Sequence, residues 1–227
     1  MAAPEPGATG VDCLHADEDL LVLHKPAGLL CVPGRGPDKQ DALSTRAQQR
    51  WPGALVVHRL DQATSGLVLM ARHLQAQRTL GSAFAEQRVH KRYQAVVRGL
   101  PPAAPGQDGW SLIDLPLGAD WPRRPMQKVD REHGKPSQTR WRIARHDARR
   151  GLTWLDLQPL TGRTHQLRVH LAALGHPILG DALYADAETQ AMAPRLLLHA
   201  CALGLAHPAT GAWVEWLCAA DLATIGP

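Results

Sequence analysis

Short apolar runs that stop at turn-forming residues mark the first part of the chain. Residues 20–24 are almost wholly apolar and lead into Lys25-Pro26-Ala27-Gly28, a pattern typical of a strand that enters a tight turn. The runs 54–57 and 67–71 contain only apolar residues and predict two buried strands. Residues 91–97 predict another strand. These segments indicate a sheet whose central strands are covered on both faces.

Helical periodicity appears in three other segments. Asp41 is expected to cap a helix that runs to about residue 49. Apolar positions recur at helical spacing over residues 73–88, which predicts a second helix. Thr164 is a suitable N-cap for a third helix over residues 165–174.

The second half of the chain contains a Pro-rich stretch and then further strands. Residues 100–137 are expected to form an irregular excursion over the surface and not a separate domain. Residues 139–146 and 152–158 alternate and predict a hairpin, and strands near 196–203 and 213–217 end the chain. Short strands, hairpins and few helices predict an α+β fold with a largely antiparallel sheet and flanking helices.

Composition limits the domain organisation and the cellular context. A chain of 227 residues suits one large domain. Residues 1–12 are rich in Ala, Pro and Gly and are expected to be a disordered tail, which leaves residues 13–227 for a catalytic domain. The four scattered cysteines predict reduced thiols in the cytoplasm. No run approaches the roughly 20 apolar residues that a membrane span needs. The composition fits a monomer.

Charge permits a nucleic-acid partner without requiring one. The net charge is +4, and Arg outnumbers Lys by 20 to 5 among the basic residues. Guanidinium groups suit phosphate binding and base stacking, but coding bias also favours Arg. Twelve histidines raise the question of a metal, yet no Cys/His cluster or H-E-x-x-H motif occurs. We therefore expect no metal site.

The candidate chemistry centres on the string H-R-L-D-Q-A-T-S-G at residues 58–66. It connects the two predicted buried strands, so Arg59, Asp61 and Thr64 share one loop. An isolated Asp in a loop is usually a turn residue. The complete string is far more restrictive, and it resembles the catalytic motif of the RluA family of RNA pseudouridine synthases, in which the Asp is essential.

Three further stretches, in the expected order, resemble the other motifs of that family. They are K-R-Y-Q-A-V-V at residues 91–97, T-G-R-T-H-Q-L-R-V-H at residues 161–170 and R-L-L-L-H-A at residues 195–200. The resemblance implies that Tyr93 lies against the uracil ring and that Arg163 pairs with Asp61. It also implies that Leu198 lines the base pocket, in a central cleft of a long bent sheet.

The resemblance extends over about residues 19–218 and points to a short branch of the family. Many relatives carry an S4-type RNA-binding domain, but the first predicted strand begins near residue 20 and leaves no room for one. The short branch acts on uridines in 23S rRNA and in the anticodon loop of tRNA. The resemblance therefore implies RNA as the partner and uridine isomerisation as the reaction, with no cofactor.

The chemistry of this reaction explains the residue types. Uracil must leave C1′ of ribose, turn and rejoin through C5, so no atom is gained or lost. One ionised carboxylate can start the reaction as a nucleophile at the sugar or the ring, or as a base at the 2′ carbon. Arg59 is suited to fill the gap that a flipped uridine leaves, and Thr64 is a candidate substrate contact. Arg123, Arg124 and Lys128 are candidates for the RNA backbone.

Two other classes of aspartate enzyme fit the string poorly. Haloacid-dehalogenase-type phosphatases need a second Asp where Ala63 stands. Aspartic proteases need the motif D-[TS]-G, but here the sequence Thr64-Ser65-Gly66 follows Ala63. An RNA-binding protein without catalysis remains the alternative from a different class. It would need a basic surface but would have no use for Asp61, Tyr93 and Arg163 together.

Overall fold

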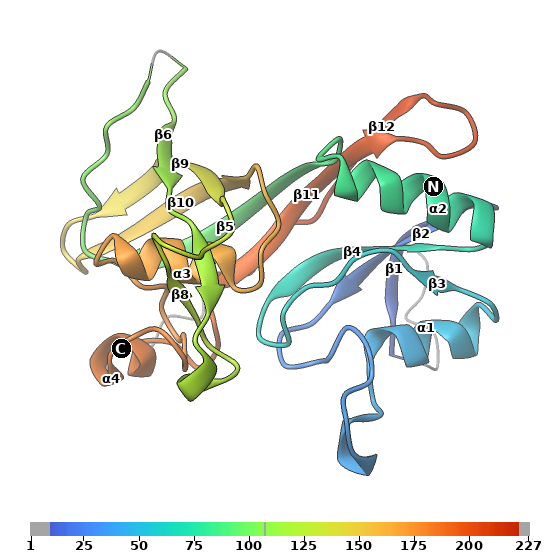
Figure 1. The fold of residues 1–227 in the computed structure, drawn as a ribbon, viewed down its shortest axis with the longest axis horizontal. Coiled ribbons are helices and arrows are strands. Elements are labelled where there is room, and N and C mark those ends of the chain that lie inside the picture. The colour runs from blue at the N-terminus through green and yellow to red at the C-terminus, as the bar shows by residue number, and fades with distance from the viewer. Residues whose placement is uncertain (1–9, 107, 223–227) are drawn as a thin grey trace. The chain divides into compact units, whose positions relative to one another are not determined.

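The structure is a computed structural model that describes residues 10–106 and 108–222 (Figure 1). The chain forms two compact units. Unit 1 comprises the chain up to Lys91 together with Ala200–Ala219, and unit 2 comprises Arg92–His199 and the segment that starts at Ala220. Of the tail expected over residues 1–12, residues 1–9 lie outside the described residues, whereas Val11 is buried.

Unit 1 is a sheet with one helix on each side (Figure 1). Its elements are β1 (Asp12–Ala16), β2 (Leu20–Lys25), the 3-10 turn η1 (Pro37–Lys39), α1 (Leu43–Arg50), β3 (Leu55–Val56), β4 (Ser65–Ala71), α2 (Leu74–Ala85) and β12 (Trp213–Leu217). The strand order is β1-β2-β4-β11-β12, with β3 on β4 and with β11 spanning Leu198–Ala206. The pairs β1–β2, β2–β4, β3–β4 and β11–β12 are antiparallel.

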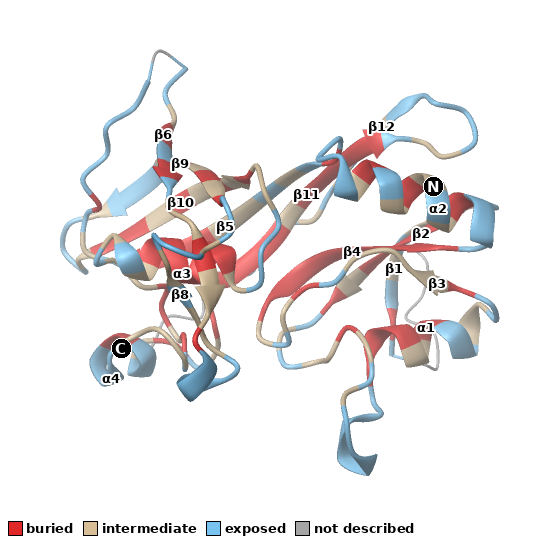
Figure 2. Cartoon of the chain, viewed as in Figure 1, coloured by how far each residue is buried: buried red, intermediate tan, exposed pale blue. Residues whose placement is uncertain are grey.

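The apolar runs of the sequence become the centre of this sheet. Every residue of β4 is buried (Figure 2), as a central strand covered on both faces requires. Leu20, Val22, Leu67 and Leu69 pack with the apolar side of α2 in one core cluster. The run 54–57 contributes only the two-residue strand β3, because the chain after Val56 leaves β4 to form the Asp61 loop.

Capping interactions set the ends of α2 inside the predicted range 73–88. The side chain of His73 caps the helix by accepting a hydrogen bond from the Ala76 N–H at 3.2 Å. At the other end Gln87 takes a left-handed conformation with φ of 58°. The Arg88 N–H donates to the Ala83 carbonyl at 2.8 Å, which is a Schellman termination. The helix therefore stops at Ala85.

Unit 2 contains four antiparallel strands of the ten-stranded sheet, a separate two-stranded hairpin and two short helices. The strand β5 (His90–Arg98) starts in unit 1 and continues into unit 2, where the sheet order is β5-β10-β9-β6. The other elements are β6 (Ser111–Asp114), β7 (Leu117–Ala119), the 3-10 turn η2 (Trp121–Arg123), β8 (Gln127–Val129), β9 (Gln138–Asp147), β10 (Leu152–Pro159), α3 (Gln166–Ala173) and α4 (Ala187–Ala191). The predicted α+β class is confirmed.

Two sequence predictions are corrected in unit 2. Residues 100–137 are not wholly irregular, because β6 pairs with β9 and the hairpin β7–β8 forms within this stretch. The helix predicted over residues 165–174 is α3, but its N-cap is His165, with φ of 54° and no side-chain cap, in place of Thr164. In unit 1, Asp41 likewise does not cap α1 and instead binds Arg46 at 2.6 Å.

A close backbone approach in unit 1 makes Gly66 a sharp test of the fold. Gly66 has φ of 118°, and a Cβ built there would lie 2.3 Å from the Ala200 carbonyl oxygen. We expect Gly66→Ala to lower the free energy of unfolding by more than about 3 kcal/mol, because both the strain and the clash are unavoidable. Urea denaturation followed by circular dichroism measures this change.

Gly81 in α2 is the matched control. Its Cβ would meet nothing within 4 Å, so Gly81→Ala should raise the free energy of unfolding by about 0.5–1 kcal/mol through helix propensity. Equal effects of the two substitutions would contradict the close approach at Gly66.

Candidate active site

Asp61 lies in the turn that leads into β4. Gln62 and Ala63 form the turn, and the Thr64 N–H donates to the Asp61 carbonyl oxygen at 3.1 Å. Asp61 is half-buried, Arg59 is exposed and Thr64 is buried. The structure therefore places the three predicted residues of this motif on one loop of unit 1, with different access to solvent.

A buried ammonium group holds this loop from within unit 1. Lys25 is fully buried, and its Nζ donates to the carbonyl oxygens of Pro26, Leu29 and Gln62 at 2.8, 2.7 and 2.9 Å. Burial lowers the pKa of Lys25 to about 8, against the opposing influence of Cys31 and Asp61. Because one acceptor belongs to the residue after Asp61, Lys25 fixes the backbone on which the carboxylate is mounted.

Two reciprocal hydrogen bonds between Gly28 and Gln62 also hold the Asp61 loop against the turn after β2. The Gly28 N–H donates to the Gln62 carbonyl at 2.9 Å, and the Gln62 Nε2 donates to the Gly28 carbonyl at 3.0 Å. On the other side of Asp61, the Leu60 N–H donates to the Cys31 Sγ at 3.2 Å. Burial raises the pKa of the Cys31 thiol. The residues on both sides of Asp61 are thus hydrogen-bonded to the segment that follows β2.

His58 anchors the start of the motif as a neutral side chain. Its Nε2 accepts the Leu69 N–H at 2.9 Å, and its ring stacks on Phe84 with centroids 4.4 Å apart. Burial, with a smaller contribution from the Lys91 charge, lowers the pKa of His58 to about 3. Neither Lys25 nor His58 was singled out from the sequence, since both stand in short motifs whose residue types do not reveal burial.

The remaining predicted residues lie in unit 2. Tyr93 is on β5, half-buried and paired in register with Leu157 of β10. Leu198 is only 3% exposed at the start of β11. Arg163 is exposed in the loop before α3, where its Nε donates to the Pro136 carbonyl at 3.3 Å. Unit 2 therefore carries one flat ring, one apolar side chain and one guanidinium from three separate motifs.

Gln166, which was quoted in a motif but given no role, organises the Arg163 loop. Its Oε1 accepts the Arg163 N–H at 3.0 Å and the Thr161 hydroxyl at 2.7 Å. Its Nε2 donates to the Gln138 carbonyl and to the Thr139 Oγ1, at 2.9 and 3.0 Å. Gln166 is 4% exposed, so this amide satisfies its polar atoms within the protein and fixes the loop to β9.

His170 completes this polar cluster beneath α3. Its Nδ1 lies 2.9 Å from the Thr139 Oγ1 and its Nε2 lies 3.0 Å from the Leu115 carbonyl. Burial lowers the pKa of His170, although the bond to Leu115 opposes this shift. A neutral ring with Nε2–H donating to Leu115 and Nδ1 accepting from Thr139 fits both contacts. Its role is therefore to support the helix that follows Arg163.

The β7–β8 hairpin presents the basic residues predicted to meet the RNA backbone. Arg123 forms an ion pair with Asp120 at 2.6 Å, and the Arg124 guanidinium lies 3.7 Å from the centroid of the Trp121 ring. Lys128 is 3.8 Å from Asp130. All three basic side chains are exposed.

The loop before α3 is joined to this hairpin through one phenol. The Tyr184 hydroxyl oxygen accepts the Gln127 N–H at 2.8 Å and lies 2.6 Å from the His165 Nδ1. A Tyr184 hydroxyl that donates to His165 and accepts from Gln127 uses its hydrogen and one lone pair. This bond links β8 to the residue that caps α3.

Comparison with known proteins identifies the class. A family model described as RNA pseudouridylate synthase matches residues 19–173. The chain therefore belongs to the RNA pseudouridylate synthase family, whose members are isomerases of uridine in RNA. Within unit 1 the matched region contains the Asp61 loop, and within unit 2 it contains Tyr93 and Arg163.

Individual members of the family show which proteins this chain resembles. The chain is 49% identical over 208 residues to the dual-specificity RNA pseudouridine synthase RluA of Escherichia coli K12, covering 92% of each chain. It is 47% identical to the enzyme of the same name from Yersinia pestis, covering 92% of this chain and 98% of that one. Among solved structures, human RNA pseudouridylate synthase domain containing 1 matches with a TM-score of 0.75 and 30% identity, covering 95% of this chain and 86% of that one.

The neutral state of His58 predicts how stability changes with pH. At pH values between the ordinary histidine pKa of about 6.5 and the folded pKa of about 3, His58 is protonated in the unfolded chain but neutral in the folded protein. Stability should therefore fall as the pH drops through this window, by up to about 1.4 kcal/mol per pH unit. His58→Gln, which keeps an acceptor for Leu69, should remove this part of the slope in urea denaturation at several pH values.

His133→Gln is the control, because the His133 side chain is 82% exposed. It should leave the pH dependence as in the parent protein, and carboxylates contribute equally to all three proteins. A His58→Gln curve parallel to the parent curve would show that His58 is not held neutral.

Proposed function

We propose that the protein converts specific uridines in RNA hairpin loops to pseudouridine, with Asp61 as the catalytic carboxylate. The observation that carries this proposal is the Asp61 loop itself. It has the H-R-L-D-x-x-T-S-G string, and Lys25, Gly28 and Cys31 hold it from both sides. This arrangement supplies a preorganised carboxylate in a half-buried position, as catalysis at a glycosidic bond demands.

A single carboxylate meets the chemical requirement. The bond from N1 of uracil to C1′ breaks, the base turns, and a new bond forms from C5 to C1′. The C5 proton then leaves, and N1 takes up a proton, so the product is an isomer of uridine. Asp61 acts as nucleophile at the sugar or the ring, or as base at the 2′ carbon. Unlike most glycosidases, the enzyme needs no second carboxylate to activate water. Water has to be kept away from the cleaved base.

The roles of the unit 2 residues follow from the family motifs. Tyr93 stacks on uracil and offers a phenol that can take the C5 proton, and Leu198 provides an apolar wall. The family resemblance implies that Arg163 pairs with the Asp61 carboxylate. The support for these roles is the match of all four motifs in order, together with the side-chain types. Residues 13–227 then act as one catalytic domain.

The target uridine has to leave its stack before any side chain reaches C1′. Flipping costs about a few kcal/mol, and less in a loop where stacking is already broken. The exposed guanidinium of Arg59 is suited to stack in the vacated gap, and Thr64 on the same loop is the second proposed substrate contact. The basic residues of the β7–β8 hairpin, Arg123, Arg124 and Lys128, then hold the RNA backbone.

The proposed substrates are hairpins of 23S rRNA and the anticodon stem-loop of tRNA. The support is the identity of 49% to an enzyme named as dual-specificity and the resemblance to the short branch of the family. We further propose that the enzyme is a monomer of the cytoplasm. Among the described residues, no helix has the length and apolar character that crossing a bilayer requires.

Release of tritium tests the central proposal. With RNA labelled at C5 of uracil, the parent protein should release tritium to water from a tRNA anticodon stem-loop and from a 23S rRNA hairpin. Asp61→Asn should reduce the rate by at least about 10⁴-fold, because it removes the carboxylate that is proposed to start the reaction. The control Asp38→Asn, an exposed carboxylate elsewhere in unit 1, should retain full activity.

Binding of the same RNAs separates this proposal from its alternative. An RNA-binding protein without catalysis would bind both hairpins but release no tritium, in the parent protein as well as in Asp61→Asn. Release from only one hairpin would restrict the specificity to that RNA.

Two substitutions at Tyr93 separate stacking from proton transfer. Tyr93→Phe keeps the ring but lacks the hydroxyl, so we expect unchanged RNA affinity and a rate that falls about 10²–10⁴-fold at the step that removes the C5 proton. Tyr93→Leu removes the flat ring and should weaken binding as well. Single-turnover tritium release and filter binding measure the two effects, and a fully active Tyr93→Phe would exclude the phenol as the proton carrier.

A further inference from the structure

The sheet of unit 2 has a second face that the proposed chemistry does not use. After the first residue of β10 the side chains alternate, with Leu155 and Leu157 buried and Trp154 and Asp156 more open. Tyr93 pairs with buried Leu157 and so lies in the row that faces the core. The opposite face, here called the outer face, carries the more open residues of β10 and exposed residues of β9.

The outer face carries arginines stacked on indole rings. Arg145 pairs in register with Trp154 and lies 3.6 Å from the centroid of its ring. Arg140 and Arg142 both lie over Trp110, at 5.2 and 4.7 Å. Two guanidinium–indole stacks therefore stand on one face of the same strands, about two residues, or roughly 7 Å, apart along β10.

Hydrogen bonds fix two of these guanidinium groups without covering them. The Nε and Nη2 of Arg142 donate to the Asp156 Oδ2 at 3.0 and 2.9 Å, and Arg140 forms an ion pair with Asp108. The Arg142 side chain remains 48% exposed. A planar cation that is held on an aromatic ring has its other face free for a base and its remaining N–H groups free for phosphate.

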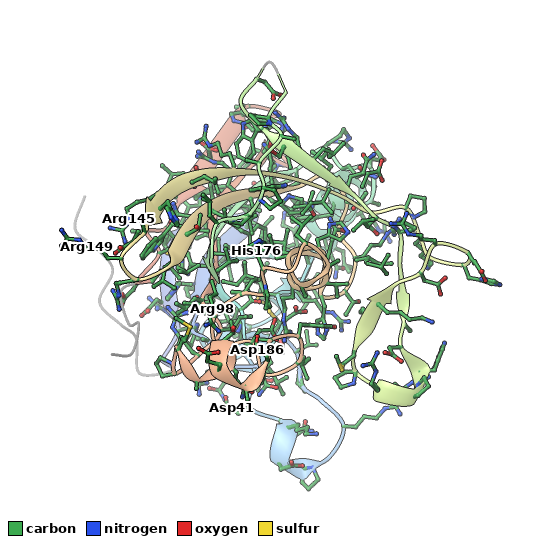
Figure 3. The ribbon with its side chains drawn as sticks, turned by 90° about the vertical axis from the view of Figure 1, so that its left-hand side faces the viewer. Asp41, Arg98, Arg145, Arg149, His176 and Asp186 are labelled. Carbon is green, nitrogen blue, oxygen red and sulfur yellow. The ribbon has the colours of Figure 1, made fainter. Side chains whose placement is uncertain are left out.

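Further arginines continue this charge at the end of the β9–β10 hairpin. Arg149 and Arg150 are exposed in the turn, where their backbone N–H groups donate to the Asp147 carboxylate. Figure 3 shows Arg145 and Arg149 at the same end of the hairpin. Five arginines stand against four aspartates, Asp108, Asp114, Asp147 and Asp156, so positive side chains outnumber negative ones by one on the outer face and its turn. This excess is complementary to a polyanion.

We propose that the outer face binds RNA nucleotides that lie outside the hairpin carrying the target uridine. The inference rests on the proposed function, which makes RNA the partner. Nucleotides stacked on Tyr93 meet the core face of β5, so they cannot also meet side chains that project from the opposite face of the same sheet. The outer face is therefore available for flanking RNA, bound through stacking and phosphate contacts.

The test compares a whole tRNA transcript with its isolated anticodon stem-loop. Both are bound to the protein in the Asp61→Asn background, so that turnover does not affect affinity. The double variant Arg145→Gln/Arg149→Gln should weaken binding of the whole tRNA by roughly fivefold or more. It should also reduce the slope of log affinity against log salt by about 1.4, for two lost phosphate contacts. Binding of the short stem-loop should not change.

The control is Arg78→Gln/Arg88→Gln, which removes the same charge from exposed positions in unit 1. It should affect the two RNAs much less than the test variant affects the whole tRNA. Circular dichroism establishes that all variants fold. The proposal would be overturned if the test variant lost no more affinity for whole tRNA than the control variant does. It would also be overturned if the test variant lost as much affinity for the short stem-loop as for whole tRNA.

Two further outcomes separate the hypotheses. If the test variant binds whole tRNA normally but binds polyglutamate more weakly, the outer face is a site for acidic peptides and the proposal fails. Tritium release by the parent protein, measured independently, decides the proposed function. Normal release with an unchanged affinity of the test variant overturns only the outer-face site.

Discussion

The position of Asp61 depends on a charge that is buried with it. Lys25 has no contact with solvent, and its three N–H groups find three backbone carbonyls on two different turns. A buried ammonium without such partners would be very costly, so the turns have to adopt the geometry that satisfies it. The same constraint that stabilises Lys25 therefore selects one conformation for the backbone around the carboxylate.

Unit 2 solves a similar problem with neutral groups. Gln166 and His170 share the hydroxyl of Thr139, and the contacts of the amide extend to Thr161 and the N–H of Arg163. A closed network of this kind specifies a unique arrangement, because breaking one bond leaves another buried polar atom unsatisfied. Each unit thus holds the backbone of a predicted catalytic residue through buried polar partners.

The sequence predicted the strong periodic elements and the residues of the family motifs, but not the local competition between polar groups. Asp41 was expected to cap α1, yet its carboxylate forms a salt bridge with Arg46 instead. Thr164 was expected to cap α3, yet His165 takes the cap position in a left-handed conformation. The strand β6 escaped prediction because its partner β9 lies more than twenty residues further along the chain. The burial of Lys25 could not be read from a residue type that is usually exposed.

The order of the units along the chain has a consequence for synthesis of the protein. Unit 1 is interrupted: its first segment ends at Lys91, and its last segment starts at Ala200, after nearly all of unit 2. The backbone of Ala200 packs directly against Gly66, at the start of the strand that follows Asp61. During synthesis on the ribosome, the segment with Asp61 is made long before β11, the strand that contains Ala200. The growing chain therefore lacks this support for β4 until nearly all of unit 2 has been synthesised. Activity in such a topology arises only when the chain is almost complete, so truncated products carry the motif without its support.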